Sequence, residues 1–359
     1  MITIGIDPHK HTHTAVAVKD ATGQLLAELT VSADEAGHER LRQWATELAG
    51  GELRFALEDI RQVSGRLERS LLAHGCDVRR VPPKLMADMR RGARQFGKSD
   101  AIDALAIARA ALREPGLPAA RSEPELRELK LLIDHRENLL RERTALASRL
   151  RWHLHDIDSG LEPRARSLGR EGPRRSLAQR LARREQSVQV RICRELLARI
   201  GQISRREAEL AGEIRGLVRG SVPALLKLPG CAELNAAKLI AEIGGADRFS
   251  SDAQLARHAG CAPIEASSGR VRRHRLSRGG NRQLNAAFYR IALTQSRTHP
   301  EARAYLAKKR AEGKSTAEAF RCLKRHLVRA VWQALRASRE EPISISQIPE
   351  KTAPAPALA

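Results

Sequence analysis

The sequence lacks the features of a membrane-spanning, disulfide-held or zinc-held protein. In 359 residues no apolar run reaches the roughly 18 residues that a transmembrane helix needs. The five cysteines are isolated, with no C-x-x-C pair and no clustered Cys/His spacing, which argues against a disulfide framework and a zinc finger. Because the chain opens on a strand-like segment, we expect no signal peptide and a cytoplasmic location. A nucleotide-binding G-x-x-x-x-G-K-[ST] loop and a repeat of solenoid period are also missing.

Acidic residues are few compared with basic ones. The chain has 42 Asp and Glu against 64 Lys and Arg, a formal net charge of +22. An excess of this size is not needed for solubility and indicates a polyanionic partner. The apolar fraction of 42% and the charged fraction of 30% are typical of a folded protein. The composition therefore predicts a nucleic-acid-binding protein of about two or three domains.

The first 120 residues alternate strand and helix patterns. Short apolar runs predict five strands, over residues 2–6, 14–18, 25–31, 53–57 and 76–81. Ser32, with Glu35 three residues later, predicts a capped helix after the third strand. Three antiparallel-looking strands followed by helix-strand-helix-strand predict an α/β domain with a mixed sheet over residues 1–120.

From about residue 123 the pattern is wholly helical, so the fold class that we expect is α/β plus all-α. Apolar residues at helical spacing predict long helices from Glu123 to Ile157 and from Leu177 to Val218. The segment between them holds eight arginines against two acidic residues over residues 162–184. We expect an antiparallel coiled coil over residues 121–219, acting either as a spacer within one chain or as a dimerisation arm.

The third region, residues 220–340, is predicted to be a helical domain. The Leu-Pro-Gly turn that ends at Gly230 lies between two short apolar helices and resembles a helix-hairpin-helix, whose backbone N–H groups can bind a phosphate. Ser315 with Glu318 predicts the start of a last long helix, which carries Lys324 on its basic face. Residues 341–359, with Ala-Pro repeats, are predicted to be a disordered tail.

Four acidic residues stand where a sheet-based metal site needs them. Asp7 follows the first strand, Glu58 ends the fourth, and Asp100 and Asp103 share a face at a helix start. Two Mg²⁺ ions about 4 Å apart can hold the attacking and leaving oxygens of a phosphodiester. Each acid alone could be solvated or could favour a helix N-terminus, but their combination in so basic a chain favours a metal site. Asp59 would point to the opposite face and is the weaker candidate.

A loop around Ser267-Ser268-Gly269 is rich in arginine. From residue 270 to residue 300 the chain has eight arginines and no acidic residue. The loop could bind phosphates with serines that only donate hydrogen bonds, which composition alone favours, or one serine could be a nucleophile that forms a phosphoserine link. The candidate nucleic-acid-binding residues are Arg270, Arg272, Arg273, Arg275, Arg278, Asn281, Arg282 and Gly230.

Together these motifs resemble the DEDD transposases of insertion sequences, a family that includes the Piv DNA invertase and the bridge-RNA-guided recombinases. The resemblance spans residues 2–335. Arg-Gly-Gly-Asn after Ser277 replaces the more usual Lys-Arg-Gly-Asn. The motifs that carry the resemblance are, in chain order, Gly5-Ile6-Asp7, Glu58, Lys98-Ser99-Asp100-Ala101-Ile102-Asp103-Ala104, Leu228-Pro229-Gly230, and Ser267-Ser268-Gly269 followed by Ser277-Arg278-Gly279-Gly280-Asn281.

The resemblance implies site residues, a cofactor and partners. It implies a RuvC-like, ribonuclease-H-type N-terminal domain that binds Mg²⁺ through the tetrad Asp7, Glu58, Asp100 and Asp103. It also implies a C-terminal transposase domain with a nucleophilic serine, which we place on Ser268, with Ser267 in reserve. The coiled coil would assemble a dimer or tetramer, and a structured guide RNA would pair with donor and target DNA.

We therefore expect an insertion-sequence transposase, a site-specific recombinase that cuts DNA with Ser268 and rejoins it. Two alternatives stay open. One is a metal-dependent nuclease or junction resolvase that uses the carboxylates and a water nucleophile. The other is a non-catalytic nucleic-acid-binding scaffold, for which the basic linker and the hairpin would suffice.

Overall fold

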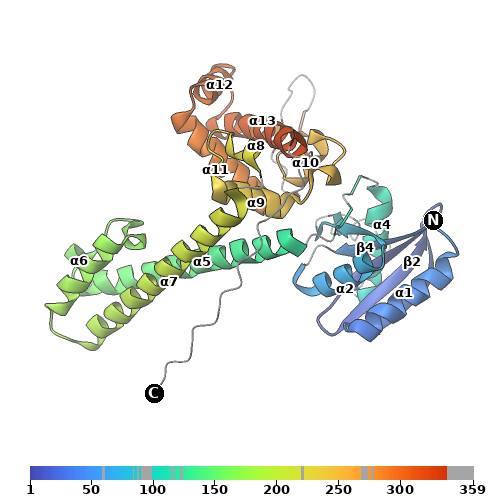
Figure 1. Ribbon diagram of the computed structural model, residues 1–359, viewed down its shortest axis with the longest axis horizontal. Helices are drawn as coiled ribbons and strands as arrows, with labels where there is room; N and C mark the ends of the chain where they lie inside the picture. The colour runs from blue at the N-terminus through green and yellow to red at the C-terminus, as the bar shows by residue number, and fades with distance from the viewer. Residues whose placement is uncertain are drawn as a thin grey trace. The chain divides into compact units, whose positions relative to one another are not determined.

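The computed structural model describes residues 1–58, 61–83, 85–86, 89, 99–114, 116–117, 119–121, 124–219, 222–267, 274–275 and 279–337. The chain forms two compact units. The first comprises Met1–Pro124 and Gly244–Arg336, and the second includes Glu125–Ile243. The colours of Figure 1 follow residue number and so distinguish these segments. The predicted tail, residues 341–359, lies outside the described residues. The helices in the described ranges are all too short or too polar to cross a membrane.

A five-stranded mixed sheet forms the N-terminal part of the first unit, as the sequence predicts. Its strand order is β3-β2-β1-β4-β5. β1 pairs antiparallel with β2, and β2 with β3, whereas β1 pairs parallel with β4, and β4 with β5. The strands are β1 (Ile2–Pro8), β2 (Thr12–Lys19), β3 (Gln24–Ser32), β4 (Leu53–Glu58) and β5 (Asp77–Val81).

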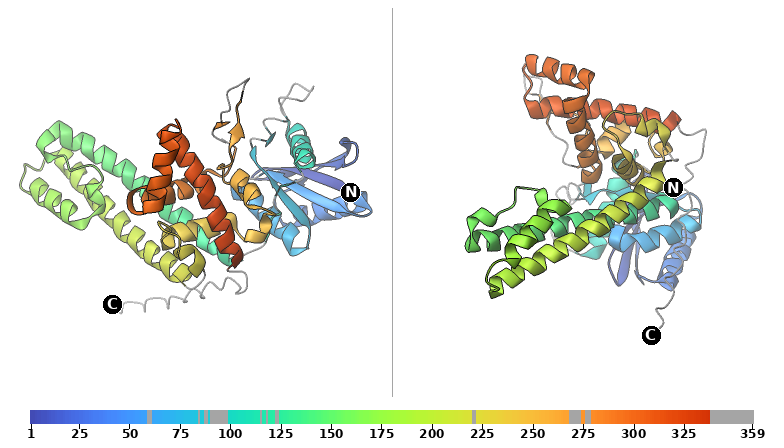
Figure 2. Two further views of the ribbon diagram at one scale, coloured as in Figure 1. Left: turned by 90° about the horizontal axis from the view of Figure 1, so that it is seen from above. Right: turned by 60° about the vertical axis from the view of Figure 1, so that its left-hand side comes forward.

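Helices cover both faces of this sheet (Figures 1 and 2). α1 (Glu35–Ala49) and α2 (Arg61–Ala73) bury one face, where Ile6 packs with Leu41 and Leu67. α4 (Asp100–Arg113) buries the other face, where Val16 packs with Ala104. β1 and β2 are buried along nearly their whole length, and β4 in its middle, so side chains on both faces of the sheet are covered and the core lies in the layers on either side.

α4 crosses the sheet directly over Gly5. A Cβ atom at Gly5 would lie 2.2 Å from the carbonyl oxygen of Ala104 and 2.5 Å from the backbone nitrogen of Ala108. Because side chains alternate along a strand, Gly5 and Asp7 share the face that α4 covers, opposite to Ile6. The Gly-Ile-Asp sequence therefore allows the helix to approach closely and places Asp7 near its N-terminus.

The first helix begins differently from the sequence prediction. β3 extends through Ser32, and α1 is capped by Asp34, whose Oδ1 accepts a hydrogen bond of 2.8 Å from the backbone N–H of Gly37. The Ser32 hydroxyl donates to the same Asp34 oxygen at 2.7 Å. The predicted Ser32 cap is wrong because the strand occupies this residue and the hydroxyl supports the cap from outside the helix.

The second unit is helical. α5 and α7 lie side by side in both Figure 1 and Figure 2, with a shared core that includes Leu150 of α5, Leu181 of α6 and Ile200 of α7. The helix predicted from residue 123 to 157 is confirmed. The unit comprises α5 (Pro124–Ile157), η1 (Ser159–Leu161), η2 (Ser167–Gly169), α6 (Glu171–Ala182), α7 (Val188–Arg219), α8 (Pro223–Leu226) and α9 (Glu233–Ile243).

The second long helix, predicted from Leu177, is instead two helices. α6 ends at Ala182 and α7 begins at Val188. In the break the side-chain amide of Gln186 donates to the carbonyl oxygens of Leu181 at 3.1 Å and Arg184 at 2.6 Å. These bonds satisfy one carbonyl in the last turn of α6 and one in the segment after it, and they stabilise the break between the helices. Coiled-coil packing and the helix-hairpin-helix stay predictions.

The C-terminal part of the first unit is helical with one short hairpin. The capping box of the last helix is confirmed, because the Ser315 N–H donates to Glu318 Oε2 at 2.9 Å and the Glu318 N–H donates to Ser315 Oγ at 3.3 Å. The elements are η3 (Ala246–Arg248), α10 (Asp252–His258), β6 (Ile264–Glu265), β7 (His274–Arg275), α11 (Arg282–Thr298), α12 (Pro300–Ala311) and α13 (Thr316–Ala337).

Candidate metal centre and serine loop

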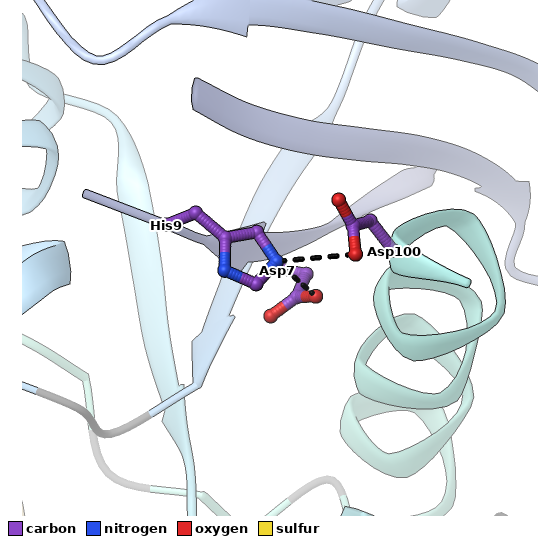
Figure 3. A group of neighbouring side chains, drawn as sticks. All are labelled: Asp7, His9 and Asp100. Atoms are coloured by element: carbon purple, nitrogen blue, oxygen red, sulfur yellow. Dashed lines mark ion pairs between the residues drawn. The ribbon is translucent and has the colours of Figure 1, made fainter. Parts of the chain in front are cut away.

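The end of β1 and the start of α4 bring two of the predicted carboxylates together. Ser99 caps α4 by accepting a hydrogen bond of 3.3 Å from the Ile102 N–H, so Asp100 is the first residue of the helix. His9 Nε2 lies 3.2 Å from Asp7 Oδ2 and 3.2 Å from Asp100 Oδ1 (Figure 3). The imidazole therefore bridges a carboxylate of the sheet and a carboxylate of the helix.

Asp103 lies one helical turn beyond Asp100 and contributes charge to the same site. It is 7% exposed, and Asp7 is 5% exposed. Burial raises the pKa of Asp7, His9 opposes this rise, and the negative charges of Asp103 and Asp100 add to it. A buried carboxylate with two more close by is held ionised most easily by a bound cation.

Glu58 ends β4 at the same edge of the sheet. The parallel register pairs Ile6 with Leu57, so the following residues, Asp7 and Glu58, lie on neighbouring strands. In the described ranges, Asp7, His9 and Asp100 form the one group of three His, Cys, Asp or Glu whose ligand atoms all lie within 4.8 Å of one another. Glu58 and Asp103 are outside that group, and Asp59 lies outside the described residues.

The residues present fit a divalent cation. Two carboxylates and an imidazole converge, and carboxylate oxygens are the ligands that Mg²⁺ prefers. His9 is a residue that our sequence analysis missed. The signal that could have found it is its position two residues after Asp7, directly after the end of β1, where its side chain still reaches the carboxylate at the strand end.

The serine loop is only partly described. β6 and β7 form a hairpin in which Ile264 pairs with Arg275, and Ser267 is exposed beyond β6. Arg275 and Arg282 are also exposed. The predicted residues that lie outside the described part are Ser268, Arg270, Arg272, Arg273 and Arg278.

The two ends of this loop are held together by close backbone contact. A Cβ at Gly280 would lie 2.1 Å from the backbone nitrogen of Gly260, and the Asn281 N–H donates to the His258 carbonyl at 2.6 Å. The Asn281 side chain caps α11 by accepting from the backbone N–H groups of the second and third residues of the helix, at 2.9 and 3.1 Å. The Gly-Gly-Asn segment therefore closes the base of the loop.

Gly230 has a local role in the Leu-Pro-Gly turn. Its φ of 79° lies in the left-handed region that glycine adopts without strain. Its carbonyl oxygen accepts a hydrogen bond of 3.2 Å from the Asn235 side chain, which lies on α9. Binding of a phosphate by this turn stays a prediction.

Comparisons with known proteins match both ends of the chain to transposases. A model for DEDD transposases of the IS110 type matches residues 4–158, and a model described as "Transposase IS116/IS110/IS902 family" matches residues 222–307. A protein of insertion element IS116 from Streptomyces clavuligerus is 31% identical over 94% of this chain and 95% of its own length. A protein of insertion element IS900 from Mycobacterium paratuberculosis is 27% identical over 92% of this chain and 95% of its own length.

Among solved structures, Thermus thermophilus RuvC matches part of the chain. The match has a TM-score of 0.26 and 17% identity, and it covers 33% of this chain and 99% of the RuvC chain.

Proposed function

Because the chain belongs to the IS116/IS110/IS902 family of transposases, enzymes that cleave and rejoin DNA, we propose that it moves an insertion sequence by a serine-nucleophile reaction at a carboxylate-bound metal. The observation that carries the proposal is the convergence of Asp7 and Asp100 on His9, with Asp103 adding negative charge. A structured guide RNA would supply sequence specificity to a dimer or tetramer in the cytoplasm.

The carboxylates Asp7, Glu58, Asp100 and Asp103 would hold Mg²⁺. The cation supplies positive charge that orients and polarises the scissile phosphate. His9 contacts both Asp7 and Asp100 and thereby fixes the strand carboxylate relative to the helix carboxylate. Burial of Asp7 under α4 keeps water away from one side of this cluster.

The serine loop would supply the nucleophile. The Ser268 hydroxyl attacks the phosphorus, a new O–P bond forms, and the bond to the leaving sugar oxygen breaks as that oxygen takes a proton. The exposed guanidinium of Arg275 stabilises the charge that develops on the phosphate. Because the strand stays attached through a phosphoester, a partner strand's hydroxyl can reverse the step without ATP.

Substitution of the serines tests the nucleophile. We expect Ser268→Ala to abolish the covalent protein–DNA adduct on denaturing gels and to abolish recombination, while DNA binding is retained. Ser267→Ala is the matched control and should keep both activities. Undiminished recombination by Ser268→Ala would exclude this serine, and strand cleavage without an adduct would indicate a nuclease that uses water.

Substitution of Asp7 tests the metal site. We expect Asp7→Asn to lower the rate of DNA cleavage by more than about 100-fold, which exceeds the effect of losing a group that only orients a ligand. Glu28→Gln, an exposed acid on β3 of the same sheet, is the matched control. If chelation of Mg²⁺ leaves every activity of the wild-type protein unchanged, a non-catalytic scaffold replaces this proposal.

A further inference from the structure

A cavity of about 720 Å³ lies beside the base of the serine loop. One side is formed by residues 260–263 and by the β7 strand, and the other by residues of α12 and α13. Its volume falls in the range of about 300–1,000 Å³ that ligand sites occupy. The lining contains six Lys and Arg side chains against two Glu, so the cavity is suited to an anion.

Lys324 is the buried cation of this cavity. The residue is 6% exposed, and its Nζ donates a hydrogen bond of 2.8 Å to the Asn285 Oδ1. No carboxylate in the described part of the chain forms an ion pair with it. Burying an ammonium without a counter-charge is costly, and one amide oxygen leaves two of its three N–H groups for other acceptors.

A second buried lysine shows how this chain neutralises such a charge. Lys238 is 1% exposed, and its Nζ lies 3.0 Å from Glu137 Oε2, 3.5 Å from Asp134 Oδ1 and 3.5 Å from Glu242 Oε1. Lys238 therefore has its counter-ions within the protein. The contrast indicates that the counter-ion of Lys324 comes from outside the described chain.

The two acids that line the cavity, and the acid that pairs with its Arg325, already have other partners. Glu312 forms an ion pair with Lys309 at 2.8 Å, and Glu318 accepts from the hydroxyl of the residue that caps α13 at 2.8 Å. Asp252 forms an ion pair of 2.8 Å with Arg325. Burial raises the pKa of the Cys261 thiol to about 11, so this lining thiol stays neutral and supplies no negative charge.

We propose that this cavity binds a backbone phosphate of the DNA strand that is led to the serine loop, with Lys324 as the buried anchor. Lys314 and Arg275 line the same cavity and have no ion pair among the described residues, so they can hold the remaining phosphate oxygens. The inference rests on the proposed function in taking DNA as the bound polymer and in placing Arg275 against a DNA phosphate. Asp7 and Ser268 have no part in it.

The first test is DNA binding by Lys324→Met, measured in EDTA with a labelled duplex from an end of the insertion sequence. We expect an affinity about ten-fold weaker, and a slope of log affinity against log salt that is less steep by about one unit, because one phosphate contact is lost. Lys308→Met is the matched control, because Lys308 is exposed on α12 and lies outside the cavity lining. Lys314→Met tests the cavity again if Lys324→Met does not fold.

The second test replaces single phosphates of the duplex by neutral methylphosphonates. One such replacement should weaken binding by wild-type protein and leave binding by Lys324→Met unchanged. The inference is overturned if Lys324→Met binds the duplex as tightly as wild type, if only RNA binding falls, or if inorganic phosphate alone binds wild type and Lys324→Met equally. Cleavage by Asp7→Asn or an adduct with Ser268→Ala would instead contradict the proposed function and leave this binding result unaffected.

Discussion

At the residue scale, the geometry of the carboxylate cluster depends on Gly5. A methyl group there would lie 2.2 Å from the backbone oxygen of Ala104, so α4 would have to move away from β1. We expect Gly5→Ala to lower the free energy of unfolding by about 1–3 kcal/mol, the usual cost of overpacking. Because α4 carries Asp100, the variant should also lose DNA cleavage. Urea unfolding and a cleavage assay measure the two effects.

Gly212 provides the matched control for Gly5. It lies within α7, and a Cβ atom added there would meet no heavy atom within 4 Å. Gly212→Ala should therefore raise the free energy of unfolding by about 0.4–1 kcal/mol, through the smaller conformational entropy of the unfolded chain. Equal effects of the two substitutions on stability would contradict the close approach of α4 to Gly5.

The candidate site could be predicted only in part, because some of its features are local in sequence and others are not. A strand end and a helix start are local patterns, and they were sufficient to predict that Asp7 and Asp100 lie close together. Helical periodicity placed Lys324 on the basic face of its helix, but the residue is buried and donates a hydrogen bond to Asn285, which is 39 residues away. No pattern within α13 contains that contact.

At the element scale, β2 and α1 are joined by two buried histidines. His13 and His38 are each 1% exposed, and their Nε2 atoms lie 3.3 Å apart. Burial lowers the pKa of His13 to about 4 and also lowers the pKa of His38. The unfolded chain therefore binds protons below pH ~6.5 that the folded chain does not, so stability is lost as the pH falls from about 6.5 toward 4.

We expect His38→Gln to reduce the pH dependence of stability in this window. The experiment is urea unfolding of wild type and variant at a series of pH values, with the difference in unfolding free energy plotted against pH. His74→Gln, an exposed histidine after α2, is the control. Parallel curves for wild type and His38→Gln would show that His38 does not contribute to the pH dependence of stability.

A buried ion-pair cluster joins α5 to α9 in the other unit. Lys238 of α9 contacts Asp134 and Glu137 of α5. Lys238→Met removes the ion-pair partner of Glu137. Lys130 still pairs with Asp134 at 2.9 Å and with Glu242 at 2.5 Å, so the unfolding free energy should fall by about 1–3 kcal/mol. Lys324→Met is the matched comparison and should cost less, since it breaks no ion pair among the described residues. Thermal melts of both variants check this difference.

The sequence predicted the elements better than their ends. Short apolar runs identified all five strands, and helical spacing placed the limits of α5 within one residue. The break between α6 and α7 was missed because apolar spacing continues on both sides of it, and the hydrogen bonds of Gln186 that stabilise it are made by a side chain. A cap was assigned to Ser32 because pattern alone does not show how far β3 extends.

At the scale of the whole molecule, the first unit joins segments that are far apart in the chain. Residues after α4 contact residues around α10, and Arg257 forms an ion pair of 2.9 Å with Glu114. The carboxylate cluster and the base of the serine loop therefore belong to one compact unit. Periodicity within a segment carries no information about such long-range contacts, which is why sequence alone did not predict them.

The net charge of +22 predicts a strong dependence of DNA affinity on salt. Arg164, Arg166 and Arg175 are exposed, and none forms an ion pair with a described residue. If all three contact phosphates, their replacement by Ser should make the slope of log affinity against log salt less steep by about 2.7, since each contact contributes about 0.9. Fluorescence anisotropy with a labelled duplex in a NaCl series gives both slopes. An unchanged slope would mean that this segment does not contact DNA.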